Sequence, residues 1–153
     1  MSFLHLKDTV STIFLGENDI TRVPPTFFKS FRRLIWLDLS KNHIREIGVG
    51  SLPSSLTTLS LSHNHFTKFP MALTDSLPEL TWYNLRGNYI EAIPLEPFHN
   101  LRQLDRLDLG ENFLTIIPPI MFNGTLTVND LNLEYNYLES IEASAFISLQ
   151  PRR

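Results

Sequence analysis

One pattern, repeated about every 24 residues, dominates this chain of 153 residues and limits what it can fold into. Six segments align as L-x-x-L-x-L-x-x-N-x-L, for example LIWLDLSKNHI (34–44) and LDRLDLGENFL (104–114). The asparagines of the pattern follow one another at intervals of 24, 22, 24, 24 and 24 residues, at Asn18, Asn42, Asn64, Asn88, Asn112 and Asn136. A fixed internal period indicates a solenoid, in which each coil buries its apolar face against its neighbours.

Each repeat contains one predicted strand. In the x-L-x-L part, apolar residues alternate with others at a period of two, which is the signal of a β-strand. One strand per coil, with no hairpin between strands, implies parallel strands joined by return segments. Side chains alternate between the two faces of a strand, so Trp36 and Asp38 should face solvent if Leu37 and Leu39 face the core.

The repeated asparagine has a structural role in this scheme. A chain that turns sharply after each strand leaves backbone N–H and C=O groups without partners. A side-chain amide both donates and accepts hydrogen bonds, so one asparagine can satisfy such groups and link neighbouring coils. We therefore expect all six asparagines to stabilise the solenoid.

The segments between the strands follow a second pattern, I-x-x-I-P-x-x-x-F-x-x-L-x-x-L. Proline after an apolar anchor favours an extended return path without a long helix, at Pro24, Pro70, Pro94 and Pro118. We expect the shared phenylalanine to point inward and form a stack, at Phe28, Phe98, Phe122 and Phe146. The second return segment (44–56) is shorter and lacks phenylalanine, and a local bulge is expected near Gly124, Thr125 and Leu126.

These motifs resemble the leucine-rich repeat family over nearly the whole chain. The 24-residue period and the F-x-x-L return are similar to the typical subclass found in animal extracellular proteins, such as the Slit, Toll-receptor and chaoptin ectodomains. The resemblance implies an α/β solenoid, a horseshoe with a concave parallel β-sheet of about six strands and a convex side of extended and 3-10 segments. It also implies that the asparagines form a ladder between coils.

The resemblance bears on domain organisation as well. We expect residues 1–153 to form a single leucine-rich repeat array of about six coils, a fragment lacking both end caps. Extracellular members usually carry cysteine-rich caps, whereas this chain has no cysteine, and its FLHLKD opening (3–8) looks like the tail of a preceding coil. Uncapped apolar ends would allow self-association.

Function in such arrays depends on the exposed strand positions. Aromatic side chains lie toward the N-terminal half of the expected concave face, and charged side chains lie toward its C-terminal half. Such a surface is typical of protein-binding sites. The candidate protein-binding residues are Phe14, Trp36, Asp38, Thr58, Ser60, Trp82, Asn84, Arg86, Arg106, Asp108, Asp130 and Asn132. The alternative is that the two tryptophans only cover their neighbours.

Other chemistry is disfavoured. His43 and His65 share a slot in adjacent coils, but other coils fill this slot with Asp19 or with aromatic residues, so we predict no metal site. Asp38 and Asp108 lie three coils apart, and Asp105 and Asp108 share one strand on an open surface that does not exclude water. Nucleophile motifs and phosphate-binding loops are absent from the sequence, so we predict neither catalysis nor a cofactor. A net charge of −3 argues against nucleic acid as a partner, and no apolar run is long enough for direct membrane insertion.

The sequence therefore predicts an interaction module that binds a protein ligand on its concave face, as part of an extracellular or cell-surface receptor or adhesion protein. The alternative is an intracellular, cytoplasmic scaffold or regulatory repeat protein, which the lack of cysteine and of a recognisable signal peptide in MSFLHLKDTV favours. A third possibility is an array segment without a ligand of its own. The sequon Asn123-Gly124-Thr125 marks Asn123 as the glycosylation candidate.

Overall fold

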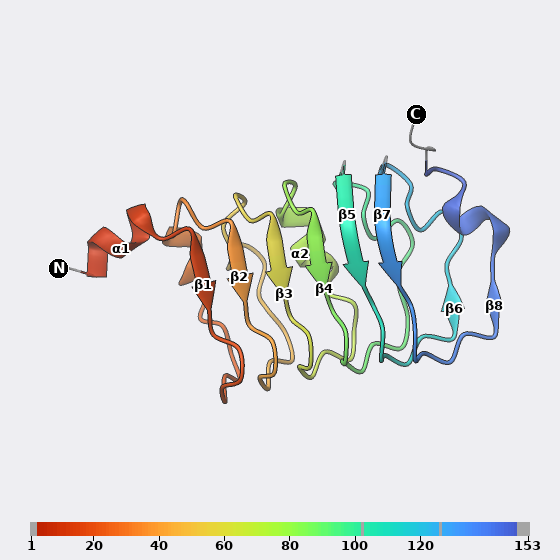
Figure 1. Cartoon of the computed structure of the whole chain (residues 1–153), viewed down its shortest axis with the longest axis horizontal. Coiled ribbons are helices and arrows are strands. Elements are labelled where there is room, and N and C mark those ends of the chain that lie inside the picture. The colour runs from red at the N-terminus through yellow and green to blue at the C-terminus, as the bar shows by residue number, and fades with distance from the viewer. Residues whose placement is uncertain (1–2, 102, 126, 150–153) are drawn as a thin grey trace.

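The chain forms a solenoid of stacked coils with a parallel β-sheet along one side (Figure 1). The computed structural model describes residues 3–101, 103–125 and 127–149. Its six-stranded sheet has the strands in chain order, one per coil: β1 (Thr12–Phe14), β2 (Trp36–Asp38), β3 (Thr58–Ser60), β4 (Trp82–Asn84), β5 (Gln103–Asp108) and β7 (Thr127–Asn132). The predicted fold class and strand number are confirmed.

The register of the sheet follows the repeat. Leu37 pairs with Leu59, Leu59 with Tyr83 and Tyr83 with Leu107, and all four side chains are buried. Because successive residues of a strand point to opposite faces, each three-residue strand turns its central residue into the core. The residues on either side of it are presented on the opposite face of the sheet, which we call the sheet face.

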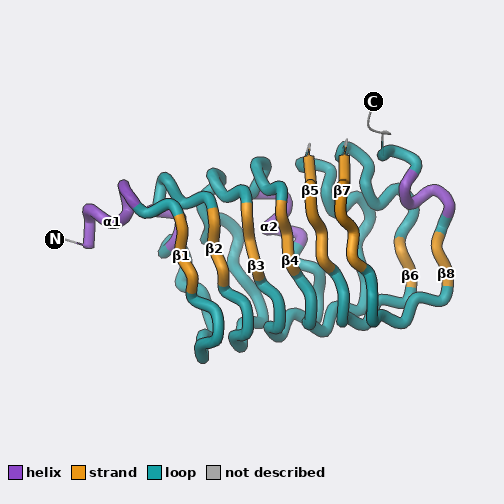
Figure 2. Tube along the Cα trace, in the orientation of Figure 1, coloured by secondary structure: helices purple, strands orange, loops and turns teal. Residues whose placement is uncertain are grey.

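The return segments form the other side of the solenoid and are mostly irregular (Figure 2). They include two 3-10 helices, η1 (Phe28–Ser30) and η2 (Ala143–Phe146), and one short α-helix, α2 (Met71–Ser76). Near the C-terminal end, β6 (Ile116–Ile117) and β8 (Ser140–Ile141) form a second, two-stranded parallel sheet that the sequence pattern did not predict.

The N-terminal segment is helical. Residues that looked like the tail of a preceding coil form the helix α1 (Phe3–Thr9), which lies beside β1 at the end of the stack (Figure 1). The backbone N–H of Val10 continues the helical bonding by donating to the carbonyl of Leu6 at 2.9 Å. Local i to i+4 bonding therefore decides the conformation of this segment, about which the repeat pattern makes no prediction.

The phenylalanine stack forms in the C-terminal part of the return side. The rings of Phe98 and Phe122 stack at 5.7 Å between centroids, and those of Phe122 and Phe146 at 5.9 Å. Phe69, which the pattern did not single out, joins this stack through an edge contact of 5.6 Å with Phe98. Phe28 points inward as expected, with 3% exposure, but it does not join this stack. Its ring packs against Phe27 and Phe31, and the second return segment supplies no phenylalanine to connect it.

The asparagine amides join neighbouring coils. In the third coil the Oδ1 of Asn64 accepts from the backbone N–H of Ile44 at 3.0 Å, while its Nδ2 donates to the carbonyl of Leu39 at 2.9 Å. Equivalent pairs of bonds to the preceding coil are made by Asn42, Asn88, Asn112 and Asn136. Asn18 differs, since its Nδ2 donates only within its own coil, to Leu15 and Gly16.

The residue before each asparagine bends the chain sharply. It has a positive φ in all six coils, between 51° and 68°, at Glu17, Lys41, His63, Gly87, Glu111 and Tyr135. Only one of the six is glycine, and at that position a Cβ would lie 2.2 Å from His63 Nδ1. The left-handed turn thus recurs without a glycine signature, which leaves it invisible in the sequence pattern.

Candidate functional site

The sheet face carries two columns of side chains that run across all six strands, and all of them except the buried Ser60 are at least partly exposed. The strand register aligns one column as Thr12, Trp36, Thr58, Trp82, Arg106 and Asp130. It aligns the other as Phe14, Asp38, Ser60, Asn84, Asp108 and Asn132. Eleven of the twelve candidate binding residues therefore occupy these two columns, and Arg86 lies two residues beyond Asn84 on the same side of its coil.

Three aromatic rings of the sheet face touch one another. The ring of Phe14 meets that of Trp36 edge-on at 5.0 Å, and Trp36 meets Trp82 at 6.2 Å with an interplanar angle of 61°. Phe14 remains 60% exposed and Trp36 39% exposed. We call Phe14, Trp36 and Trp82 the aromatic patch. It is a continuous apolar surface that spans the first four coils, since the two indoles meet across the smaller Thr58.

Short polar side chains of the second column brace the turns that follow the strands. The Oδ1 of Asp38 accepts from the backbone N–H of Ser40 at 2.8 Å. The Oδ1 atoms of Asn84, Asp108 and Asn132 each accept the equivalent hydrogen bond from the backbone N–H two residues later, at 3.0, 2.9 and 2.9 Å. Asp and Asn are therefore equivalent for this structural task, whereas only an aspartate adds a negative charge. The recurrence of Asp or Asn at one slot of four coils was the sequence signal for it.

The C-terminal half of the sheet face is held together by Arg86. Its Nη2 donates to Glu111 Oε1 at 2.8 Å, its Nη1 lies 3.8 Å from Asp108 Oδ1, and its guanidinium lies 5.8 Å from the centre of the Tyr135 ring. The hydrogen bond with Glu111 raises the pKa of Arg86, and the charges of Asp108, Glu111 and Glu134 add to this rise. The guanidinium is thus committed to side chains of the chain itself.

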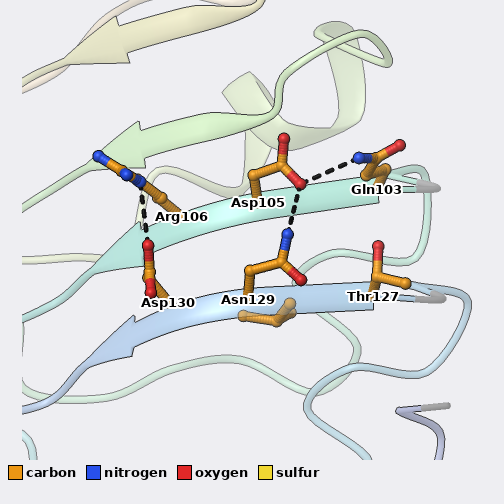
Figure 3. A pocket seen from close by; sticks show the side chains of 7 residues that line it. Gln103, Asp105, Arg106, Thr127, Asn129 and Asp130 are labelled. Atoms are coloured by element: carbon orange, nitrogen blue, oxygen red, sulfur yellow. Dashed lines mark hydrogen bonds and ion pairs between the residues drawn. The ribbon is translucent and has the colours of Figure 1, made fainter. Parts of the chain in front are cut away.

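The neighbouring strands β5 and β7 carry a polar hollow at their N-terminal ends (Figure 3). Asp105 accepts from Gln103 at 2.9 Å and from Asn129 at 2.8 Å, while Arg106 pairs with Asp130 at 3.0 Å. The hollow is lined by Gln103, Asp105, Arg106, Thr127, Val128, Asn129 and Asp130. Gln103 and Thr127 were not among the candidate residues because they lie one step before the shared pattern. Asp105 and Asn129 occupy its second position, which the two candidate columns did not include.

A second row of rings follows the rim beside the sheet face. The rings of Tyr89 and Phe113 stack at 6.0 Å and those of Phe113 and Tyr137 at 5.6 Å, and all three side chains are exposed. His43 and His65 extend the row at 5.1 Å from each other, and His65 reaches Tyr89 at 5.9 Å. From the sequence we interpreted this slot as one that only tolerates polar and aromatic residues. The constant spacing of the coils nevertheless brings the rings at this slot into contact.

The described part of the chain contains neither a cluster of metal-ligating side chains nor a helix that could span a membrane. Among residues 3–101, 103–125 and 127–149, no group of three or more His, Asp or Glu side chains is placed to hold a metal ion. The helices within those ranges are also too short and too polar to span a bilayer. The geometry instead provides an exposed aromatic patch, a charged half and a ring row, which are elements of a surface for recognition.

The glycosylation candidate lies on the return side of the solenoid, away from the sheet face. Asn123 is exposed and its Nδ2 donates to Glu96, while Gly124 adopts a φ of +86°. Thr125 is buried and its hydroxyl donates to the carbonyl of Phe98 at 2.9 Å. The bulge expected here rested partly on Leu126, which lies outside the described residues.

Comparison with known proteins agrees with this architecture. The family model for leucine rich repeats matches residues 8–66, 54–114, 78–125 and 102–150. Among solved structures, the chain resembles the TLR13 chain of the TLR13–ssRNA13 complex, with a TM-score of 0.82 and 25% sequence identity over 91% of this chain. The match covers 20% of that TLR13 chain, so this chain spans a fifth of the receptor it resembles. The chain belongs to the leucine-rich repeat family.

Proposed function

We propose that this chain is a protein-interaction module that binds a protein ligand on its sheet face. The observation that carries the proposal is the aromatic patch, in which Trp36 contacts both Phe14 and Trp82, with Phe14 and Trp36 still substantially exposed. Large rings that remain accessible and are held in place by one another lose little conformational freedom on binding, which is why Trp and Tyr dominate the energetics of interfaces. The adjacent charged half would supply orientation and specificity.

We further propose that the module belongs to the extracellular or cell-surface part of a receptor or adhesion protein. The support is the 24-residue repeat with its phenylalanine stack, together with the likeness to a segment of TLR13. The absence of cysteine favours the alternative of an intracellular scaffold. Export of the chain from animal cells behind a signal sequence would separate the two, since a glycan on Asn123, absent from Asn123→Gln, supports the extracellular assignment.

The nature of the ligand follows from charge. The TLR13 structure contains single-stranded RNA, but the sheet face of this chain carries Asp38, Asp105, Asp108, Asp130 and Glu134. Phosphate backbones are bound by surplus Lys and Arg, and here both Arg86 and Arg106 are paired with carboxylates of the chain itself. A protein is therefore the ligand that we propose, in preference to a nucleic acid.

The direct test is a binding screen against a library of purified ectodomains with matched variants. Trp36→Ala combined with Trp82→Ala should weaken binding of any specific ligand by at least about thirtyfold, because two anchors of an interface core are removed. Leu95→Ala is the control, since Leu95 is equally an exposed apolar residue, 63% exposed, but lies on a return segment. Equal binding by the folded double variant would overturn the proposal.

A further inference from the structure

The cations of the sheet face are almost all engaged within the chain. Lys41 pairs with Glu17, Arg86 with Glu111, and Arg106 with Asp130. Asp38 is different, because within the ranges that the structure describes no Lys, Arg or His forms an ion pair with it. Asp38, on the N-terminal half of the sheet face, thus has no ion-pair partner among the described residues.

Two aromatic residues of the sheet face neighbour Asp38. Phe14 is its direct partner in the sheet, and Trp36 lies two residues earlier on the same face of β2. Its Oδ1 accepts from the N–H of Ser40, whereas Oδ2 lies near Gly16, at which a Cβ would lie 3.6 Å from that oxygen and 3.0 Å from Ser40 Oγ. Gly16 therefore carries no side chain that could pair with Oδ2.

The chain itself shows what fits beside such an aspartate. In the fifth coil Asp108 holds the slot equivalent to Asp38, and Arg86 of the preceding coil holds the slot that Gly16 holds in the coil before Asp38. The guanidinium of Arg86 lies 3.8 Å from Asp108 Oδ1 and 5.8 Å from the centre of the Tyr135 ring. A carboxylate of this column therefore already receives a guanidinium beside an aromatic ring once on this face, and at the equivalent place beside Asp38 the chain has a glycine instead of the arginine.

We propose that Asp38, Phe14 and Trp36 form a second guanidinium site, which receives an arginine side chain of the protein ligand. The carboxylate would accept hydrogen bonds from the fork of the guanidinium at Oδ2, and the planar cation would lie against the aromatic rings, within the ~6 Å over which cation–π attraction acts. This inference rests on the proposed function, and it specifies the ligand as a protein that projects an arginine from an apolar contact region.

Trp36 belongs to this site and the second tryptophan of the chain, Trp82, contacts its ring at 6.2 Å, so intrinsic fluorescence reports on the site. The probe is an acetylated, amidated pentapeptide with two arginines separated by glycine. The matched control peptide carries citrulline, which has a similar shape but no charge. We expect the arginine peptide to change the fluorescence saturably and the citrulline peptide to leave it unchanged at the same concentrations.

Two variants separate pairing with Asp38 from general charge effects. Asp38→Asn should weaken peptide binding about tenfold while the fold is kept, since Asn84 and Asn132 make the same turn bond in this column. Glu46→Gln removes one negative charge from the return side and should leave binding unchanged. Phe14→Ala should weaken binding about threefold through loss of one ring.

The outcomes distinguish this inference from the proposed function. Equal affinity of the arginine peptide for the original chain and for Asp38→Asn, or equal affinity for the citrulline peptide, overturns the guanidinium site. A protein ligand that depends on Trp36 and Trp82 but is indifferent to Asp38→Asn also overturns it, yet leaves the protein-binding function intact. Arginine-specific peptide binding lost in Asp38→Asn supports the site even if the ectodomain screen finds no ligand.

Discussion

The indole rings of Trp36 and Trp82 meet at 6.2 Å, although the strand that carries Thr58 lies between them. Backbones two strands apart are separated by about 10 Å, so the rings reach each other only by leaning over the smaller side chain. This contact makes the aromatic patch part of the structure as well as a surface for a ligand. The contact should therefore contribute to the free energy of unfolding by an amount that can be measured.

A double-mutant cycle should detect the Trp36–Trp82 contact. Trp36→Ala and Trp82→Ala should each lower the free energy of unfolding modestly, and their effects should be less than additive by about 0.5–1.5 kcal/mol, the range for aromatic pairs. Urea denaturation of the two single variants and the double variant gives this coupling energy. Strict additivity would show that the rings do not interact in solution.

The asparagines should differ in importance according to their bonds. Asn64 is buried and bonded to two coils, so Asn64→Ala leaves backbone groups unsatisfied and should lower the free energy of unfolding by about 1–3 kcal/mol. Asn18 is exposed and bonded only to its own coil, so Asn18→Ala should cost less than about 0.5 kcal/mol. Chemical denaturation compares the pair directly, and similar losses for both would contradict the role assigned to the links between coils.

Tyr83 should be more stable as phenylalanine. Its side chain is fully buried in a slot that the other coils fill with leucine or isoleucine, and its hydroxyl has no hydrogen-bond partner among the described residues. Tyr83→Phe removes the desolvated hydroxyl and keeps the ring, so the free energy of unfolding should rise by up to about 1 kcal/mol. Tyr83→Leu is the control, and should destabilise the chain by leaving a cavity. Destabilisation by Tyr83→Phe would indicate that the hydroxyl has a partner.

The same residue should make the fold sensitive to alkali. Burial raises the pKa of Tyr83 well above its usual range, so the folded chain keeps the phenolic proton while the unfolded chain loses it above pH ~10. The unfolded state then binds fewer protons, and the stability that is present below pH ~10 should fall by up to about 1.4 kcal/mol per pH unit as the pH rises further. Thermal unfolding between pH 9 and 11.5 tests this, since Tyr83→Phe should lose this part of the pH dependence.

Much of the fold and the membership of the sheet face could be predicted from the sequence. A constant period with period-two alternation leaves one register in which every coil buries its leucines, and this register aligns Trp36 with Thr58 and Trp82. The same constant period also places the side-chain amide of each repeat asparagine after Asn18 between its own coil and the preceding one. Local departures were less predictable, because the pattern is silent about residues 3–9, which form a helix, and about Phe69, which joins the phenylalanine stack.

The sequence by itself determined which residues share a column, because coil length and strand alternation depend only on spacing along the chain. Tertiary structure decided which side chains within and between columns touch, because contact depends on side-chain length and direction across coils. Trp36 and Trp82 meet, Arg86 occupies the site at Asp108, and Asp38 keeps an open carboxylate oxygen beside Phe14. Two aspartates that the repeat makes equivalent thus differ in their contacts, since among the described residues only Asp108 forms an ion pair with a cation of the chain.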